Sequence, residues 1–236
     1  GSPTNRRHNI GVGANKLNGL LIAPDEEFSL VQTLGEVNAA TGYLPELVIK
    51  GNKTIPEYGG GLCQIGTTMF RVALYAGLPI TERRPHSYRV SYYEPAGMDA
   101  TIYIPRPDVK FINDTRNYLV LTTEIQDNIL RFKLYGTNDN RKTEIENPPR
   151  IWNITYPGPT KLIETLDLAP GEKKCTESSH RGADTEFTRV VTYADSREPI
   201  DEKWFSRYSS WQAVCLIGVE ELTVSTSSEE VVDVIE

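Results

Sequence analysis

The stretch Tyr58-Gly59-Gly60-Gly61-Leu62-Cys63-Gln64-Ile65-Gly66-Thr67-Thr68-Met69-Phe70 organises the rest of this chain. Three consecutive glycines allow positive φ and a close approach of the backbone to another group. The apolar residues that follow recur at the spacing of one helix face, at Ile65, Met69, Val72, Ala73 and Ala76. Gly77 and Pro79 are stop signals for that helix. We therefore predict a helix over residues 64–76, with Cys63 on its first turn.

A cysteine at the start of a helix has two interpretations. The positive end of the helix stabilises a thiolate, and the free backbone N–H groups there can bind an oxyanion. Gly61 and Gln64 are the candidate oxyanion donors. The alternative is that Cys63 is a small buried apolar residue, as free cysteines usually are, and that the glycines mark only a tight turn.

Length and charge limit the classes of protein. A chain of 236 residues allows one or two domains, and a net charge of −7 argues against a nucleic-acid partner. No apolar run is long enough to span a membrane. The opening Gly-Ser-Pro resembles an expression-tag remnant, so we expect residues 1–9 to be a loose tag or linker. Any membrane attachment is then expected only through a segment outside this sequence.

The cysteine count is odd. Cys175 and Cys215 lie in the C-terminal part of the chain, and Cys63 stands apart from them. In an exported chain this arrangement predicts one disulfide, Cys175–Cys215, and one free thiol. The alternative is three unrelated reduced thiols in a cytosolic protein.

Short elements surround the central helix. We expect strands at residues 20–22, 47–49, 88–92 and 100–104, a short helix after Ser29, and a hairpin of residues 119–125 with 130–135. Together they predict an α+β domain over residues 10–140, with a mainly antiparallel sheet and one prominent helix starting at Cys63.

The second part of the chain is predicted to form a separate module. Residues 136–150 are polar and contain Asn147-Pro148-Pro149, a good domain boundary. Beyond it, strand-like runs at residues 161–166, 186–193 and 213–217 predict a small all-β module over residues 150–222. The Ser- and Glu-rich residues 223–236 are expected to be a disordered tail.

Six short motifs carry a resemblance to a known family. In chain order they are GANKLNG (13–19), IAPDEEFS (22–29), GGGLCQ (59–64), AGLPITER (76–83), PHS (85–87) and GMDAT (97–101). This part of the chain resembles the VanW domain, named for an accessory protein of vancomycin-resistance clusters. One departure is that Gly66 stands where the family usually has Ser. The module over residues 150–222 resembles the extracellular G-five type of β module, although another small β sandwich fits the same pattern.

The resemblance to VanW domains implies an exported protein of the bacterial cell envelope. Some members have been connected with L,D-transpeptidase activity on peptidoglycan, which uses the motif cysteine. We therefore expect Cys63 to be the nucleophile of an acyl transfer on stem peptides. His86 is the histidine within the motifs and the candidate base, and Asp99 is the candidate residue that orients it.

Further residues of the same stretch are candidate substrate contacts. Guanidinium groups suit a substrate carboxylate, which points to Arg83, Arg84 and Arg89. Ser87 and Tyr92 are added as substrate contacts. Each residue also has a structural alternative: His86 as a backbone partner at a strand entry, Asp99 as a turn residue, and the arginines as a solvated face.

The main alternative function is a non-catalytic peptidoglycan-binding module or an adaptor for another envelope enzyme. A platform of tyrosines would then bind the wall, formed by Tyr88, Tyr92, Tyr93 and Tyr103. A zinc site is not expected, since the sequence has no CxxC or HxxxH pair to join Cys63 and His86. We expect no cofactor and a monomer.

Overall fold

The computed structural model describes residues 2–50 and 53–222, which form two compact units. The first unit contains residues up to 156 together with residues 181–210, and the second contains residues 157–180 and those from 211 onward. The expected tail over residues 223–236 lies outside the described residues. The strands predicted for the second module are therefore shared between the two units. Whether residues 10–140 and 150–222 separate on cleavage stays a prediction.

The helices of the first unit include one that the sequence analysis missed. The α-helices are α1 (Thr4–Leu17), α2 (Leu30–Leu34) and α3 (Leu62–Tyr75), and short 3-10 turns cover Ala39–Thr41 and Ser91–Tyr93. Helix α3 confirms the predicted central helix, and Ser29 caps α2 by accepting a hydrogen bond from the Gln32 N–H. The expectation of a loose segment over residues 1–9 is wrong from Thr4 onward.

Antiparallel pairing dominates the strands of the first unit. They form three sheets. The first contains β1 (Leu20–Ile22), β7 (Leu119–Gln126) and β8 (Ile129–Tyr135), and the second contains β2 (Glu27–Ser29), β6 (Lys110–Ile112) and β5 (Ile80–Glu82). The third is the pair of β3 (Pro45–Lys50) and β4 (Lys53–Tyr58). The β7–β8 hairpin is confirmed, with Asp127 and Asn128 at the positive φ angles of 50° and 64° that its tight turn requires. The α+β class is therefore correct.

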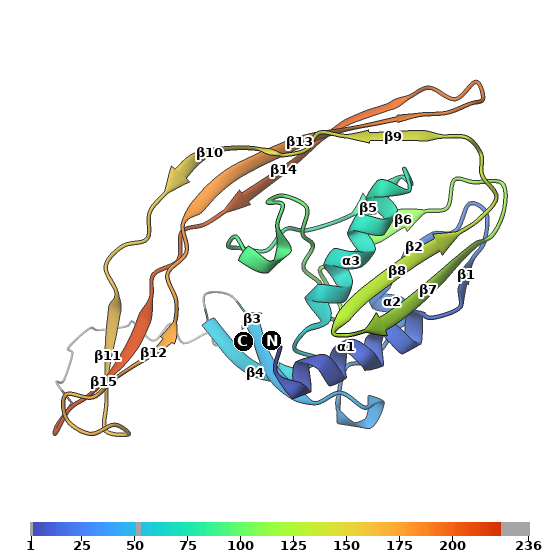
Figure 1. Cartoon of the computed structure of the whole chain (residues 1–236). Coiled ribbons are helices and arrows are strands. Elements are labelled where there is room, and N and C mark those ends of the chain that lie inside the picture. The colour runs from blue at the N-terminus through green and yellow to red at the C-terminus, as the bar shows by residue number, and fades with distance from the viewer. Residues whose placement is uncertain (1, 51–52, 223–236) are drawn as a thin grey trace, which may run out of the picture. The chain divides into compact units, whose positions relative to one another are not determined.

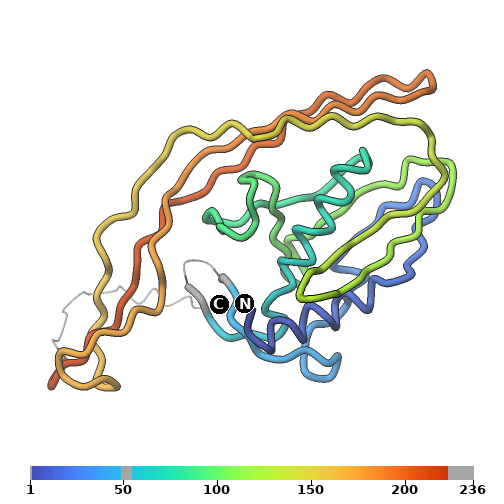
Figure 2. Tube along the Cα trace, viewed as in Figure 1, coloured from blue at the N-terminus to red at the C-terminus, as the bar shows by residue number. Residues whose placement is uncertain are grey.

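A fourth sheet runs along the same unit. It consists of β9 (Lys142–Ile145), β10 (Arg150–Thr155), β13 (Gly182–Thr192) and β14 (Ile200–Tyr208), with β13 paired to all three others. Figure 1 shows β13 and β14 as a long hairpin on the side of α3 opposite α1. Figure 2 shows the same two stretches side by side along their length.

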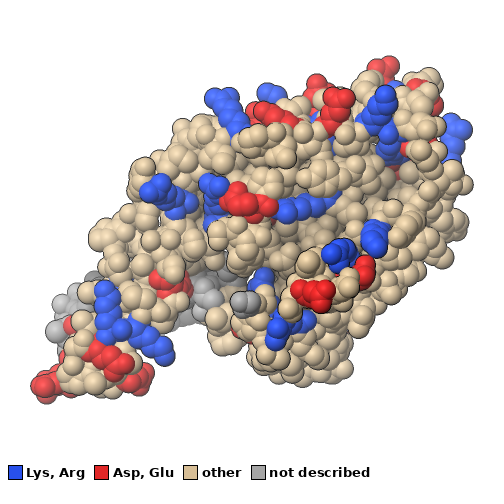
Figure 3. Space-filling view, in the orientation of Figure 1, with Lys and Arg blue, Asp and Glu red and all other residues tan. Residues whose placement is uncertain are grey.

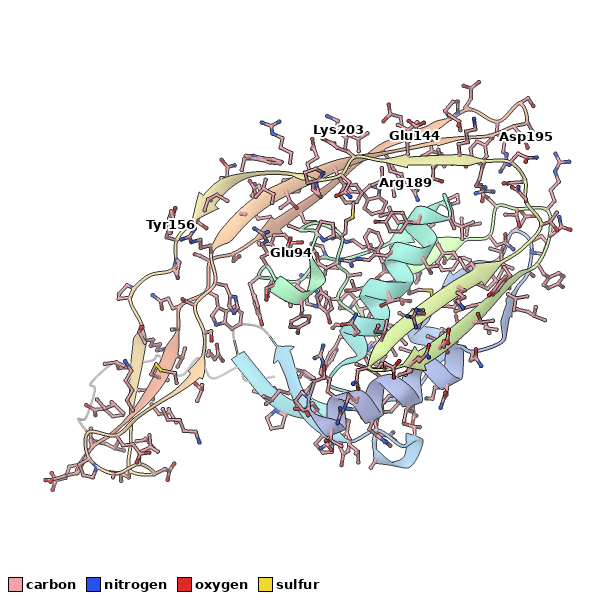
Figure 4. The ribbon with its side chains drawn as sticks, viewed as in Figure 1. Glu94, Glu144, Tyr156, Arg189, Asp195 and Lys203 are labelled. Carbon is pink, nitrogen blue, oxygen red and sulfur yellow. A yellow bond between two sulfur atoms is a disulfide. The ribbon has the colours of Figure 1, made fainter. Side chains whose placement is uncertain are left out.

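Helix α3 lies at the centre of the core. Its buried face contains five residues with an exposed fraction of 0%, namely Ile65, Met69, Phe70, Ala73 and Leu74. The helix packs against α1 and β8. On its other side, Arg189 of β13 points toward the helix and donates to the Leu74 carbonyl oxygen at 3.3 Å (Figure 4). Burial of this apolar face fixes the position of the helix start.

Two predicted strands are absent from the structure. Residues 88–92 form a loop that enters the Ser91–Tyr93 turn, and residues 100–104 run without a ladder. The Thr101 N–H bonds the Arg84 carbonyl oxygen, and the Ala100 N–H bonds the Thr67 hydroxyl. Single bonds to different partners replace the regular ladder that an alternating pattern predicts. Pro95 follows the first segment, and Pro105 and Pro107 follow the second.

The second unit is a small sheet of three strands. The strands are β11 (Lys161–Thr165), β12 (Lys173–Glu177) and β15 (Val214–Gly218), with β15 in the middle, parallel to β11 and antiparallel to β12. The predicted Cys175–Cys215 disulfide is confirmed, and it joins residues directly opposite each other on β12 and β15. Cys63 is the free cysteine.

Charged side chains are mixed on the visible surface. On the face drawn in Figure 3, lysine and arginine alternate with aspartate and glutamate. No helix among the described residues is long and apolar enough to cross a membrane.

Candidate active site

The start of α3 is shaped by glycine. Gly61 is the residue before the helix and has φ of 111°, a conformation that residues with a side chain rarely adopt. A Cβ atom at this position would lie 2.9 Å from Cγ of Arg6. The Leu62 N–H bonds the Gly59 carbonyl oxygen at 3.0 Å, which closes the turn. This turn places Cys63 as the second residue of α3, half-buried, near the positive end of the helix.

The Cys63 sulfur faces the loop that carries the GMDAT motif. It lies 3.4 Å from the Thr101 hydroxyl oxygen and 3.6 Å from the Ile102 carbonyl oxygen. The same loop packs on α3 through Gly66, where an added Cβ would lie 3.0 Å from Cγ2 of Ile102. The glycine that departs from the family pattern therefore lets this loop approach the helix closely.

His86 and Asp99 form the second half of the site. The Nδ1 atom of His86 lies 2.5 Å from Oδ2 of Asp99, and the His86 backbone N–H donates to the same oxygen at 2.8 Å. Both residues are buried, with exposed fractions of 4% and 3%. Because Nδ1 is held by Asp99, the Nε2 atom is the ring nitrogen left to interact with Cys63, whose thiol pKa His86 lowers. The structure therefore brings Cys63, His86 and Asp99 together in the order of a catalytic triad.

The pKa values of the three groups are shifted together. Burial raises the pKa of the Cys63 thiol, but the hydrogen bond and charge of His86, helped by Thr101 and Ile102, lower it to about 7. Burial lowers the pKa of His86, but hydrogen bonds to Asp99 and Cys63 raise it to about 9. Burial raises the pKa of Asp99, while His86 and Arg83 lower it to about 2. A thiolate and an imidazolium are therefore the favoured pair between pH 7 and pH 9.

Two residues hold the Asp99 side chain from its other side. Arg83 donates from Nε to the Asp99 carbonyl oxygen at 2.7 Å and from Nη2 to Oδ1 at 3.4 Å, and its side chain is 2% exposed. Tyr208 of β14 donates its hydroxyl to Oδ1 and accepts the Gly97 N–H at 2.8 Å. Arg83 also donates to Ser206 at 2.8 Å. Arg83 therefore pairs with Asp99, and its side chain is buried from solvent.

The remaining candidate contacts lie around this core. The Gln64 N–H bonds the Gly61 carbonyl oxygen at 2.9 Å, so this donor is already used. The Arg89 Nε donates to Glu94 at 2.6 Å. Ser87 has an exposed side chain, and its carbonyl oxygen accepts the Ser209 N–H. Arg84 and Tyr92 are exposed. Substrate contact by these residues stays a prediction.

Three residues near the site were missed by the sequence analysis, and a fourth, Tyr93, was named only as part of the alternative wall-binding platform. Thr101 lies within a recognised motif, and its hydroxyl could have been noticed there. Tyr208 is distant in sequence, and no local pattern links it to Asp99. Arg6 was assigned to the loose N-terminus, yet its Nη2 lies 3.4 Å from the Tyr93 hydroxyl. Tyr93 in turn stacks on His86 with ring centroids 5.0 Å apart.

The fold is α+β with mainly antiparallel sheets, and it brings a cysteine, a histidine and an aspartate together near the start of α3. These features define a class of α+β proteins with a cysteine-centred site. Within the described residues, no three His, Cys, Asp or Glu side chains are grouped so as to hold a metal ion. The family profile described as "VanW like protein" matches residues 5–135, and the chain belongs to this family.

Two curated relatives match parts of the chain. "Uncharacterized protein YoaR" of Bacillus subtilis is 29% identical over 150 residues, which cover 63% of this chain and 49% of that protein. "Vancomycin B-type resistance protein VanW" of Enterococcus faecalis is 35% identical over 116 residues, 47% of this chain and 42% of that protein. The chain thus spans less than half the length of the curated relatives it matches.

A solved structure is also among the matches. The "IgA1 Protease G5 domain structure" is 15% identical, covers 36% of this chain and 100% of its own, and has a TM-score of 0.22. So low a score carries no argument about the second module, and its G-five-like character stays a prediction.

Proposed function

We propose that this protein is a cysteine acyltransferase that acts on peptidoglycan stem peptides, in the manner of an L,D-transpeptidase. The observation that carries the proposal is the grouping of Cys63, His86 and Asp99 at the start of α3: His86 is bonded to Asp99, and it lowers the pKa of the Cys63 thiol. A thiol whose pKa is lowered to about 7 is substantially ionised at neutral pH. A structural cysteine needs neither an imidazolium nor a buried carboxylate behind it.

The first half of the reaction forms a thioester. The Cys63 thiolate attacks the carbonyl carbon of the donor residue, and a carbon–sulfur bond forms while the carbonyl becomes an oxyanion. The helix start stabilises this negative charge. The carbon–nitrogen bond then breaks, and His86 gives its proton to the departing amine of the terminal D-alanine. Asp99 keeps the imidazole in the orientation that this transfer requires.

The second half transfers the acyl group. The amine of a second stem peptide attacks the thioester carbonyl, and neutral His86 accepts the proton that this nitrogen loses. The carbon–sulfur bond breaks, a new amide bond remains, and the thiolate with its imidazolium is restored. One amide is exchanged for another, so the sequence of steps needs no cofactor.

Substrate and location rest on the family. One matched relative is named as a vancomycin B-type resistance protein, and the resemblance to VanW domains implies an exported protein of the cell envelope. We place the protein on the extracytoplasmic side of the cell envelope, where peptidoglycan stems are found. The disulfide of the second unit agrees with an oxidising compartment.

Binding without catalysis is the second candidate. It is favoured by the exposure of Tyr92 (61%) and Tyr103 (42%), because exposed aromatic rings suit saccharide or peptide contact. Tyr93 cannot belong to such a platform, because it is 3% exposed and stacked on His86. A binding module would retain its affinity for the wall when the thiol is removed.

The decisive experiment compares wild type with Cys63→Ala on purified muropeptides, with products read by mass spectrometry. A transpeptidase yields cross-linked products and free D-alanine with wild type only. Sedimentation of both proteins with insoluble peptidoglycan serves as the control for binding. Equal sedimentation, with no product from the wild type, would favour the binding module and reject the acyltransferase.

A further inference from the structure

Arg6 of α1 lies directly beside the start of α3. A Cβ atom at Gly61 would be 2.9 Å from Cγ of Arg6 and 3.1 Å from its carbonyl oxygen. Gly61 precedes α3, and Cys63 is the second residue of that helix. The backbone contact therefore brings a basic residue to the edge of the cysteine site from a helix that the sequence analysis did not expect.

The guanidinium group is held against aromatic rings. Its Nη2 donates to the Tyr93 hydroxyl at 3.4 Å, and its Cζ lies 5.4 Å from the ring centroid of Tyr92. Tyr93 stacks on His86, so the cation and the imidazole lie along the same aromatic pair. This arrangement orients the guanidinium while it remains half-buried.

The charge of Arg6 is not neutralised by a carboxylate in the described part of the chain. Burial lowers its pKa, but Tyr93, Tyr92 and Cys63 together raise it above its ordinary value, and no carboxylate is among these groups. By contrast, Arg83 is paired with Asp99, and Arg89 is paired with Glu94. A guanidinium has five N–H donors in a planar fork that fits a carboxylate. Arg6 therefore has unused capacity to bind an anion next to the nucleophile.

We propose that Arg6 binds the free carboxylate of the acyl donor, at the residue that directly follows the scissile carbonyl. The inference rests on the proposed function and names the feature of the donor that the site selects. A terminal carboxylate lies roughly 4 Å from the carbonyl of the preceding residue, the spacing of neighbouring residues in a chain. The site thus selects peptides that end one residue beyond the bond to be broken, and the leaving group is a single amino acid.

A pair of small alkylating reagents tests the carboxylate site without any peptide. Iodoacetate and iodoacetamide both transfer a two-carbon unit to the thiolate and release iodide, and only iodoacetate carries a carboxylate. Cys63 is the one thiol of the oxidised protein, because the other two of its three cysteines form the disulfide. The rate with iodoacetate divided by the rate with iodoacetamide therefore reports on the surroundings of Cys63 alone.

The matched variants are Arg6→Gln and Arg7→Gln. Both remove one positive charge from neighbouring positions of α1, and Arg7 is exposed and bonds only Asn128 at 3.5 Å among the contacts described. We expect Arg6→Gln to lower the rate ratio roughly tenfold, the effect of losing one charge-assisted hydrogen bond, and Arg7→Gln to leave it unchanged. Arg6→Lys keeps the positive charge and loses the planar guanidinium group, so its rate ratio should lie between those of wild type and Arg6→Gln.

Two results would overturn the inference. If Arg6→Gln slows both reagents equally, Arg6 acts on the thiolate and not on a carboxylate. If Arg7→Gln lowers the ratio as much as Arg6→Gln, the effect is that of general charge. Circular dichroism checks the fold, and if Arg6→Gln fails to fold, a wild-type ratio in Arg6→Lys rejects the role of the planar fork.

The peptide stage separates this inference from the proposed function. Donor peptides ending in a carboxylate or in a carboxamide are compared for kcat/KM, and we expect Arg6→Gln to abolish the preference for the acid. No turnover by the wild type, together with an Arg6-dependent reagent ratio, would reject the acyltransferase and retain the carboxylate site. Turnover with equal rates for both peptides would retain the acyltransferase and reject the role of Arg6.

Discussion

Replacing Asp99 by Asn tests whether the buried carboxylate controls the thiol. The change keeps the size of the side chain and removes the charge that raises the pKa of His86 to about 9. We expect that pKa to fall toward its ordinary 6.5, because only the interaction with Cys63 is then left to oppose burial. Without an imidazolium beside it, the Cys63 thiol loses the main cause that lowers its pKa to about 7 and returns to 9.0 or above.

The expected size follows from these values. A shift of about two pKa units corresponds to roughly 3 kcal/mol of lost thiolate stabilisation. At pH 7 the thiolate fraction falls from about one half to about one hundredth, so alkylation by iodoacetamide slows roughly fifty-fold, less a modest gain in the nucleophilicity of each thiolate. The assay is the alkylation rate of Cys63 from pH 5 to pH 10, followed by intact-mass spectrometry.

The matched control is Asp108→Asn. Asp108 is a second carboxylate with the same exposed fraction of 3%, and it bonds the Ser29 hydroxyl and the Val31 N–H rather than the site. This variant should lose stability and keep the wild-type midpoint. A folded Asp99→Asn protein whose alkylation midpoint stays within half a unit of wild type would refute the coupling between Asp99, His86 and Cys63.

Four further predictions concern stability. The pKa of Asp99 is depressed from 3.8 to about 2, so its contribution of about 2 kcal/mol to the free energy of unfolding is present above pH 4 and is lost as the pH falls toward 2. The free energies of urea unfolding of wild type and Asp99→Asn should therefore converge near pH 2. Tyr208→Phe should cost about 1–3 kcal/mol in the same assay, because Asp99 and the Gly97 N–H each lose a partner, and an unchanged unfolding midpoint would contradict this. Replacing Cys175 and Cys215 by Ser should destabilise the second unit by roughly 3–4 kcal/mol, while Cys63 alkylation in the folded protein stays at the wild-type rate. Non-reducing peptide mapping that finds both thiols free in wild type would count against the disulfide. The Pro-Pro step and the polar run predict a module boundary near residues 140–155, and limited proteolysis that yields no stable fragment with an end in this range would argue against two separable modules.

The sequence predicted the parts of the fold that local pattern controls. Helix α3 is amphipathic and bounded by glycine and proline signals, and the β7–β8 hairpin has alternating residues around Asp127 and Asn128. Cys63, His86 and Asp99 were also predicted together, because they lie in short motifs shared with a family. What the motifs could not supply is the geometry of the support around them.

The failures have a common physical cause, which is burial of polar residues by tertiary contacts. Asn9 of α1 is 0% exposed, and its side chain bonds the backbone of Leu44 and Gly60. A helix whose buried face includes asparagine and glycine does not show the apolar period from which helices are predicted. Arg83 was predicted to contact a substrate carboxylate, with a solvated face as the alternative, and its burial was missed because its partners Asp99 and Ser206 are far away in sequence.

The contribution of β14 to the site has a consequence for how this protein can evolve. Tyr208 and Ser206 hold Asp99 and Arg83, yet both lie well beyond residue 135, where the match to the family ends. A recombination that joined the first 140 residues to a foreign β module would deliver the nucleophile without the hydroxyl groups behind its carboxylate. Such an exchange is viable only when the incoming strand carries hydroxyl side chains two residues apart, on the same face. The two stretches of gene are therefore expected to be inherited and to change as a pair.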